Sequence, residues 1–218
     1  MMRILFQGDS ITDGNRYQDE ERRWDLNHQM GHGYAFMVNG FLGARYPEGR
    51  YEFVNRGVSG NTVEDLRARL DRDILDVKPD VLSILIGVND CLRAVRNNQT
   101  DIDADRFGET YRRILGETAA KLPGIRILLC EPFILPVGQV KENYAVWKRM
   151  IGRIQGKVRE LSAEFHTILV PLQKTFDERC GVREAAYWIW DGIHPAVCGH
   201  QVIADKWIDA FLSHGLIR

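Results

Sequence analysis

The chain has 218 residues and a formal net charge of −1, with 44% hydrophobic and 27% charged residues. This length and composition predict one globular domain over residues 1–218 with a sizeable core. The pI is near 6.6 and no basic stripe stands out, which argues against a nucleic-acid partner. No apolar run approaches the ~20 residues that span a bilayer, which argues against a membrane protein.

The N-terminus and the cysteines favour a cytoplasmic location. The apolar run Ile4–Phe6 is far shorter than the ~7–15 residues of an export signal, and Asp9 follows it closely. The cysteines show neither CxxC spacing nor the pattern of a disulfide framework, so we expect reduced thiols at Cys91, Cys130, Cys180 and Cys198. The sequence leaves open whether the chain forms a homo-oligomer.

Short apolar runs alternate with longer amphipathic stretches along the chain. The short runs are rich in Ile, Val and Leu, and they predict buried strands at Ile4–Gln7, Glu52–Asn55, Val81–Ile86, Arg126–Cys130 and Ile168–Pro171. The amphipathic stretches predict helices at Tyr34–Arg45, Thr62–Ile74, Asp105–Lys121, Tyr144–Phe165 and Ala196–Ser213. This alternation predicts an α/β fold, in which a parallel sheet carries helices on both faces and functional loops at the carboxyl ends of its strands.

The first stretch that suggests chemistry is Gly8-Asp9-Ser10, directly after the first predicted strand. Gly8 permits a tight turn from strand to helix, so Ser10 would lie at the tip of the turn, beside unpaired backbone N–H groups. A serine in this place can cap the helix, belong to a phosphate-binding loop or act as a nucleophile. The tripeptide alone does not choose between these three roles.

The second stretch, Asn55–Leu66, follows the second predicted strand and contains Gly57 and Gly60. These glycines indicate a positive φ or a close approach to another group. The Gly60 N–H could face a cleft and donate to an oxyanion, although a loop built only for turning fits as well. Asn61 or Thr62 is expected to cap the helix that follows.

The third stretch is Ser83–Arg93, in which the predicted strand ends at Ile86. Asn89 offers a neutral side-chain N–H donor, which suits a developing oxyanion, and Asp90 is expected to cap or brace the loop. An ordinary Asn-Asp turn explains the pair equally well when the stretch is taken alone.

The fourth stretch is Trp190–Pro195, where two residues separate Asp191 from His194. A loop of this length can bring the carboxylate to one imidazole nitrogen and leave the other nitrogen facing a cleft. Taken alone, the histidine is more simply read as a surface residue. Together, however, a serine, two oxyanion donors and an Asp/His pair are the parts that an acyl-transfer enzyme needs.

The four stretches resemble the motifs of the SGNH hydrolases, also called the GDSL-type esterases. The matching segments are Gly8–Thr12, Gly57–Thr62, Gly87–Asp90 and Asp191–Pro195, although Ile11 replaces the name-giving leucine. The match runs from near the first residue to the closing helix. The resemblance implies a three-layer α/β/α sandwich, similar to flavodoxin, around a five-stranded parallel sheet.

The resemblance also implies a role for each matched residue. Ser10 would be the nucleophile, His194 the base and Asp191 the carboxylate that orients the base. The N–H groups of Ser10 and Gly60 and the side chain of Asn89 would form the oxyanion hole. This chemistry invokes no cofactor and no metal ion.

Within the family, three segments look most like the intracellular acetyl xylan esterases and related carbohydrate deacetylases: Gly31–Ala35, Asn55–Asp90 and Trp190–Ala204. This likeness implies a small ester or acetylated sugar as the substrate, with acetyl groups on xylo-oligosaccharides as the expected target. Leu92 occupies the region where several members carry a tryptophan, so the substrate pocket is expected to differ. A lysophospholipase or thioesterase for longer acyl chains is the alternative within the family.

Two readings from other classes compete. A flavodoxin-like module that binds phosphate or nucleotide would also place a loop after the first strand, but Asp9 and Asp13 would repel a phosphate. A zinc hydrolase could be imagined from His194, Cys198 and His200, although the last two are expected on different faces of a helix. Cys91 lacks a base and is interpreted as a small apolar filler.

Trp190 and Asp9 are the residues that we expect to contact the substrate beside the reacting groups. If Tyr187–Trp190 is extended, Trp188 and Trp190 share one side of it. Trp24 and the loop from Thr12 to His32, which is crowded with charged residues, could contact sugar hydroxyls, although core packing and solvation explain these features as well.

Overall fold

The computed structural model describes residues 1–19 and 26–217, and the predicted strands form one parallel sheet in it. The strand order is β2-β1-β3-β4-β5. The bounds are β1 (Met2–Gly8), β2 (Tyr51–Asn55), β3 (Val81–Leu85), β4 (Arg126–Cys130) and β5 (Ile168–Val170). The central residues of β1, Ile4 to Phe6, have no exposed surface, because the strand lies inside the sheet and helices cover both of its faces.

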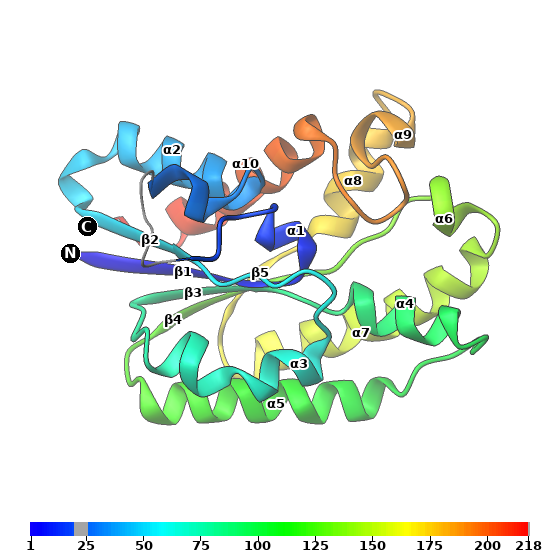
Figure 1. Cartoon of the computed structure of the whole chain (residues 1–218), viewed down its shortest axis with the longest axis horizontal. Helices are drawn as coiled ribbons and strands as arrows, with labels where there is room; N and C mark the ends of the chain where they lie inside the picture. The colour runs from blue at the N-terminus through cyan, green and yellow to red at the C-terminus, as the bar shows by residue number, and fades with distance from the viewer. Residues whose placement is uncertain (20–25, 218) are drawn as a thin grey trace.

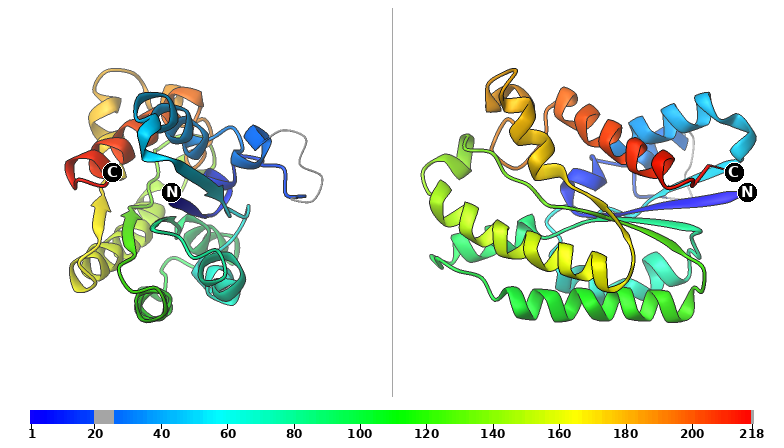
Figure 2. Two further views of the ribbon diagram at one scale, coloured as in Figure 1. Left: turned by 90° about the vertical axis from the view of Figure 1, so that its left-hand side faces the viewer. Right: turned by 180° about the vertical axis from the view of Figure 1, so that it is seen from behind.

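Helices cover both faces of the sheet and produce three layers (Figures 1 and 2). The helices on one face are α2 (Tyr34–Arg45), α8 (Leu172–Cys180) and α10 (Val197–Ser213). The helices on the other face are α3 (Val63–Ala68), α5 (Ala104–Lys121) and α7 (Tyr144–Glu164). The expected α/β/α sandwich is therefore confirmed. In the described part of the chain, no helix combines the length and the apolar character needed to cross a membrane.

Several helices lie where the sequence predicted loops. The longest of these are α4 (Val88–Arg96) and α8. Single turns of helix are present at α1 (Ser10–Asp13), α6 (Gly138–Lys141) and α9 (Ala185–Trp188), with 3₁₀ turns at η1 (Leu26–Met30) and η2 (Pro47–Gly49). Figure 1 shows α1, α4, α6 and α9 at the same end of the sheet, where the strands have their carboxyl ends.

The predicted helix Thr62–Ile74 is interrupted. Helix α3 ends at Ala68, and a π-helical turn, η3 (Asp71–Leu75), follows it. Arg69 lies at the break and turns its guanidinium toward the end of β1, where it donates to the carbonyl oxygen of Gly8 at 3.1 Å and to the side chain of Gln7 at 2.7 Å. The break therefore ties this helical segment to the strand that precedes Ser10.

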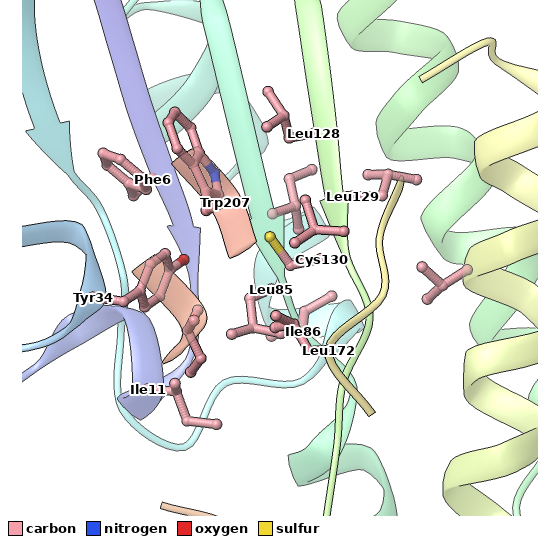
Figure 3. Close-up of a cluster of buried hydrophobic side chains, with 14 of the residues drawn as sticks. Phe6, Ile11, Tyr34, Leu85, Ile86, Leu128, Leu129, Cys130, Leu172 and Trp207 are labelled. Atoms are coloured by element: carbon pink, nitrogen blue, oxygen red, sulfur yellow. The ribbon is translucent and has the colours of Figure 1, made fainter. Parts of the chain in front are cut away.

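The core extends to the segment that carries Ser10. Trp207 of α10 packs on Phe6 with ring centroids 5.3 Å apart (Figure 3). Its indole N–H donates to the Ser83 hydroxyl of β3 at 2.9 Å. Tyr34 packs edge-on against Phe6, and its hydroxyl lies 3.0 Å from the Thr12 hydroxyl in α1. Buried aromatic packing thus fixes the short helix in which Ser10 stands.

Candidate active site

Ser10 is the first residue of α1, which begins immediately beyond the end of β1. Asp9 caps this helix, because its Oδ1 accepts a hydrogen bond from the Ile11 N–H at 3.1 Å. The capping role that was open for Ser10 therefore belongs to Asp9, and the serine hydroxyl is available for another partner. Gly8 is needed at the turn because a Cβ there would collide with the carbonyl oxygen of Leu85 on β3.

The loop between α9 and α10 brings an imidazole to the Ser10 hydroxyl. Ser10 Oγ lies 2.8 Å from His194 Nε2, and His194 Nδ1 lies 2.8 Å from Asp191 Oδ2. The other carboxylate oxygen, Asp191 Oδ1, accepts from the backbone N–H groups of Ile193 at 2.9 Å and His194 at 2.7 Å. The loop thus folds around its own carboxylate, as the short Asp-His spacing predicted.

The charges of this pair favour a proton-accepting imidazole. The hydrogen bond to Asp191 raises the pKa of His194 above its ordinary value of 6.5, against the opposing effect of burial. Burial acts to raise the pKa of Asp191, but hydrogen bonds from His194 and from two backbone N–H groups outweigh it and hold this pKa below its ordinary value. Asp191 is therefore an anion at neutral pH, and it would stabilise an imidazolium at His194.

The two further N–H donors that the sequence predicted for the oxyanion lie on the segments that follow the two strands next to β1. β1 lies between β2 and β3 in the sheet, so the segments that follow β2 and β3 lie on either side of the segment that follows β1. Gly60 has φ +82° and open space beside its Cα, and within residues 1–19 and 26–217 its N–H makes no hydrogen bond. Asn89 donates one amide hydrogen to the Asn61 carbonyl at 3.1 Å, which orients the amide and leaves its second hydrogen available.

The residues next to these donors are braced as the sequence predicted. Thr62, and not Asn61, caps α3 in a reciprocal capping box with Asp65. Asp90 accepts from the Val63 N–H, with its two oxygens at 3.3 and 3.4 Å. The start of α4 is therefore attached to the start of α3. Burial raises the pKa of Asp90 to about 7.

Asp9, which the sequence analysis expected to contact the substrate, is buried and has a structural role. Asp9 is only 1% exposed and lies beneath the start of α1, where it serves as the helix cap. Burial raises its pKa to about 7, while the Ile11 N–H and the nearby His194 act in the opposite direction. Asp9 therefore acts on the site through its charge, which interacts with His194, and through its cap on α1.

Asn55, at the end of β2, supports the Ser10 segment and was missed by the sequence analysis. Its amide donates to the carbonyl oxygens of Thr12 at 2.6 Å and Met30 at 2.9 Å, and its Oδ1 accepts from the Gly57 N–H at 2.8 Å. The side chain is buried, so one residue joins α1, η1 and the loop that contains Gly60. The only local signal was an Asn two positions before a glycine.

The aromatic residues before Asp191 have different environments. Trp190 is 64% exposed, and its ring stacks on the His194 ring with a centroid distance of 5.8 Å and an interplanar angle of 21°. Trp188 is buried and donates its indole N–H to the carbonyl oxygens of Arg179 and Arg183. The condition under which the two indoles would share a side, an extended Tyr187–Trp190, is not met, because Tyr187 and Trp188 belong to α9. Trp24 and the charged residues 20–25 lie outside the described residues.

The residues of the zinc alternative do not converge on one centre. His194 is bonded to Asp191, the Cys198 thiol donates to the Tyr187 carbonyl at 3.0 Å, and His200 Nδ1 accepts from the Tyr34 N–H at 3.2 Å. Across residues 1–19 and 26–217, no group of three or more His, Cys, Asp or Glu side chains could hold a metal ion. Burial raises the pKa of the Cys91 thiol, which fits its interpretation as an apolar filler.

Comparison with known proteins agrees with this fold. The family model of the GDSL-like Lipase/Acylhydrolase family matches residues 6–202. An acetylxylan esterase from Geobacillus stearothermophilus is 35% identical over 206 residues, which cover 93% of this chain and 90% of that protein. The chain is therefore a carboxylic ester hydrolase. It belongs to the GDSL-like lipase/acylhydrolase family.

Solved structures show the same relationship in three dimensions. A putative GDSL-like lipase from Parabacteroides merdae superimposes with a TM-score of 0.89 and 39% identity, covering 96% of this chain and 94% of that chain. The crystal structure of the Geobacillus stearothermophilus acetylxylan esterase gives a TM-score of 0.82 with 32% identity, covering 96% and 93% of the two chains.

Proposed function

We propose that this protein removes acetyl groups from acetylated xylo-oligosaccharides through an acetyl-enzyme on Ser10. The observation that carries the proposal is the pair of 2.8 Å hydrogen bonds that joins Ser10 to His194 and His194 to Asp191. The similarity to acetylxylan esterase over nearly the whole chain supports the choice of substrate. Solved variants of that relative, described as catalytic mutants, replace a serine and an aspartate with alanine, which are the residue types of Ser10 and Asp191.

In the first half of the reaction, the Ser10 hydroxyl oxygen attacks the acetyl carbonyl carbon while His194 Nε2 takes the hydroxyl proton. The resulting oxyanion accepts hydrogen bonds from the N–H groups of Ser10 and Gly60 and from the Asn89 amide. When the intermediate collapses, the bond to the sugar oxygen breaks, and His194 gives its proton to that oxygen. The products of this half are a free sugar hydroxyl and an acetylated Ser10.

In the second half, a water molecule repeats the attack. His194 takes one proton from the water as its oxygen bonds to the acetyl carbon, and the same three donors hold the new oxyanion. The bond to Ser10 Oγ then breaks, and the proton on His194 returns to this oxygen. Acetate leaves, and the hydroxyl is restored. Asp191 keeps its charge throughout and stabilises the imidazolium in both halves.

Trp190 is the residue best placed to contact the sugar. Its indole is largely exposed and stacks on the imidazole that protonates the leaving oxygen. A flat apolar ring suits the face of a pyranose, so the sugar would pack on Trp190 while its ester reaches Ser10. The four cysteines are free thiols, which supports the proposal that the enzyme works in the reducing cytoplasm.

The decisive experiment measures acetate release from acetylated xylo-oligosaccharides, together with hydrolysis of p-nitrophenyl esters from acetyl to octanoyl. We expect acetate release and a steep fall in kcat/KM beyond butyryl. Ser10→Ala should lower kcat by about 10³-fold or more, and Ser213→Ala, at the far end of α10, should not change it. A preference for octanoyl esters would reassign the substrate to longer acyl chains, and an active Ser10→Ala variant would refute the mechanism.

A further inference from the structure

We infer that Gln139 is a positioning residue for this reaction: it holds Asp191 from a separate segment of the chain and sets the proton affinity of the Asp191–His194 pair. The expected effect of Gln139 on kcat rests on the proposed function. Its expected effect on the pKa of His194 does not. Gln139 lies in α6, in the connection that follows β4. No motif in the sequence pointed to it.

Gln139 contacts Asp191 twice. Its side-chain amide donates to Asp191 Oδ2 at 2.9 Å, and its backbone N–H donates to the Asp191 carbonyl oxygen at 3.0 Å. Asp191 Oδ2 is the same oxygen that receives the His194 Nδ1 hydrogen. The other donors to the carboxylate, Ile193 and His194, belong to the loop of Asp191 itself. Gln139 thus links the acid to a different part of the fold.

The two segments fit against each other through their backbones. Gly138 has φ +51°, and a Cβ on it would collide with the backbone of Asp191. Gly192 has φ +95°, and a Cβ on it would collide with the Val137 carbonyl oxygen. The Leu135 N–H donates to the Gly192 carbonyl at 3.0 Å. Because both glycines permit this close approach of the two backbones, the side-chain amide of Gln139 is held against the Asp191 carboxylate.

Gln139 lies at the rim of the site. Its side chain is exposed, whereas the Asp191 side chain is only 11% exposed. The amide therefore covers part of the carboxylate without being part of the core. Replacing Gln139 should change the surroundings of Asp191 while leaving the packing of the fold intact.

The amide and the imidazole share the charge of one oxygen. A neutral N–H donor on Asp191 Oδ2 stabilises the anion and reduces its attraction for the proton on His194. Without this donor, the carboxylate should bind the imidazolium more strongly, and the pKa of His194 should rise. The other titratable groups that act on His194 are Asp9 from the start of α1 and His200 from α10, and both stay unchanged when Gln139 is replaced.

The kinetic test compares Gln139→Leu with Gln201→Leu. Gln201 is a matched control, because it is an exposed glutamine whose amide also donates to an aspartate, Asp205, at 2.8 Å. We expect Gln139→Leu to lower kcat about tenfold with little change in KM, and to move the acidic limb of kcat/KM upward by about half a pH unit. Gln139→Glu should move this limb further, because a second carboxylate would face the pair. A wild-type kcat and pH profile in Gln139→Leu would overturn the inference.

A second readout needs no substrate. NMR titration of the His194 imidazole should show a higher pKa in Gln139→Leu and a still higher one in Gln139→Glu, with Gln201→Leu equal to wild type. An unchanged His194 titration in both variants would refute the inference even if the enzyme is active. A chain without activity on any ester would refute the proposed function, while the titration would still decide the role of Gln139. Thermal unfolding verifies that each variant is folded. If either Gln139→Leu or Gln139→Glu fails to fold, the titration of the other variant tests the inference.

Discussion

Replacement of Asn89 by alanine tests whether its side chain binds the oxyanion. Asn89 is 7% exposed and stands in the first turn of α4, and the Asn61 carbonyl holds one of its two amide hydrogens at 3.1 Å. The second hydrogen is therefore oriented before the substrate arrives. A donor that is already in place stabilises the developing charge without reorganising.

The size of the expected loss follows from this geometry. Asn89→Ala removes one of three proposed donors and leaves the N–H groups of Ser10 and Gly60. Removal of one such donor should lower kcat by about 10²–10³, which corresponds to about 3–4 kcal/mol. The KM should change little, because the donor acts mainly on the transition state. The loss of the bond to Asn61 should cost only about 1 kcal/mol of folding stability, since Asn61 is not fully buried and water can replace the amide.

Steady-state kinetics on acetylated xylo-oligosaccharides, with Asn97→Ala as the control, would measure this effect. Asn97 is an exposed asparagine at the other end of the same helix, so its loss should leave kcat unchanged. A raised KM with a normal kcat in Asn89→Ala would make Asn89 a residue that binds the ground state. Normal values of both constants would remove it from the oxyanion hole.

Three further perturbations test other parts of the site. Asp191→Asn should lower kcat by about 10²–10⁴ and move the acidic limb of the pH–rate profile downward, because the hydrogen bond to Asp191 is what raises the pKa of His194. Trp190→Ala should raise KM about fivefold or more for acetylated xylo-oligosaccharides but leave KM for ethyl acetate unchanged; equal effects on both esters would argue against sugar stacking. Burial lowers the pKa of His200 to about 4, whereas the unfolded chain protonates near 6.5, so the free energy of unfolding in urea should fall by about 1–3 kcal/mol from pH 6.5 to 4, and His200→Asn should flatten this dependence.

The sheet was predictable because buried parallel strands are continuous apolar runs. The strand Arg126–Cys130 has the predicted bounds, and the others differ by at most two residues at either end. The missed helices carry weaker patterns. In α8 only Leu172 and Phe176 are buried, and α4 turns small residues such as Cys91 and Ala94 toward the core. Such short or weakly apolar faces give little periodic signal.

The candidate site was predictable where its chemistry depends on short spacings. Asp191 and His194 belong to one tight loop, and Ser10 follows its strand directly, so local sequence indicates their geometry. Asn55 and Gln139 could not be found in this way. Both act through side-chain bonds to distant segments, and these bonds depend on the packing of the whole fold. The capping role of Asp9 was missed because the sequence does not show which of two adjacent polar residues caps a helix.

The two sides of the site are built differently, and this difference predicts how substitutions on each side should behave. The proposed oxyanion donors stand on segments that leave neighbouring strands, and Asn55 and Asp90 join those segments to one another. Changes to Asn55 or Asn89 should lower kcat and leave the pH profile in place, because neither side chain titrates. His194, the proposed base, stands on a loop held by its own hydrogen bonds and by Gln139. Changes there should move the pH profile together with kcat, since they alter the proton affinity of His194 itself.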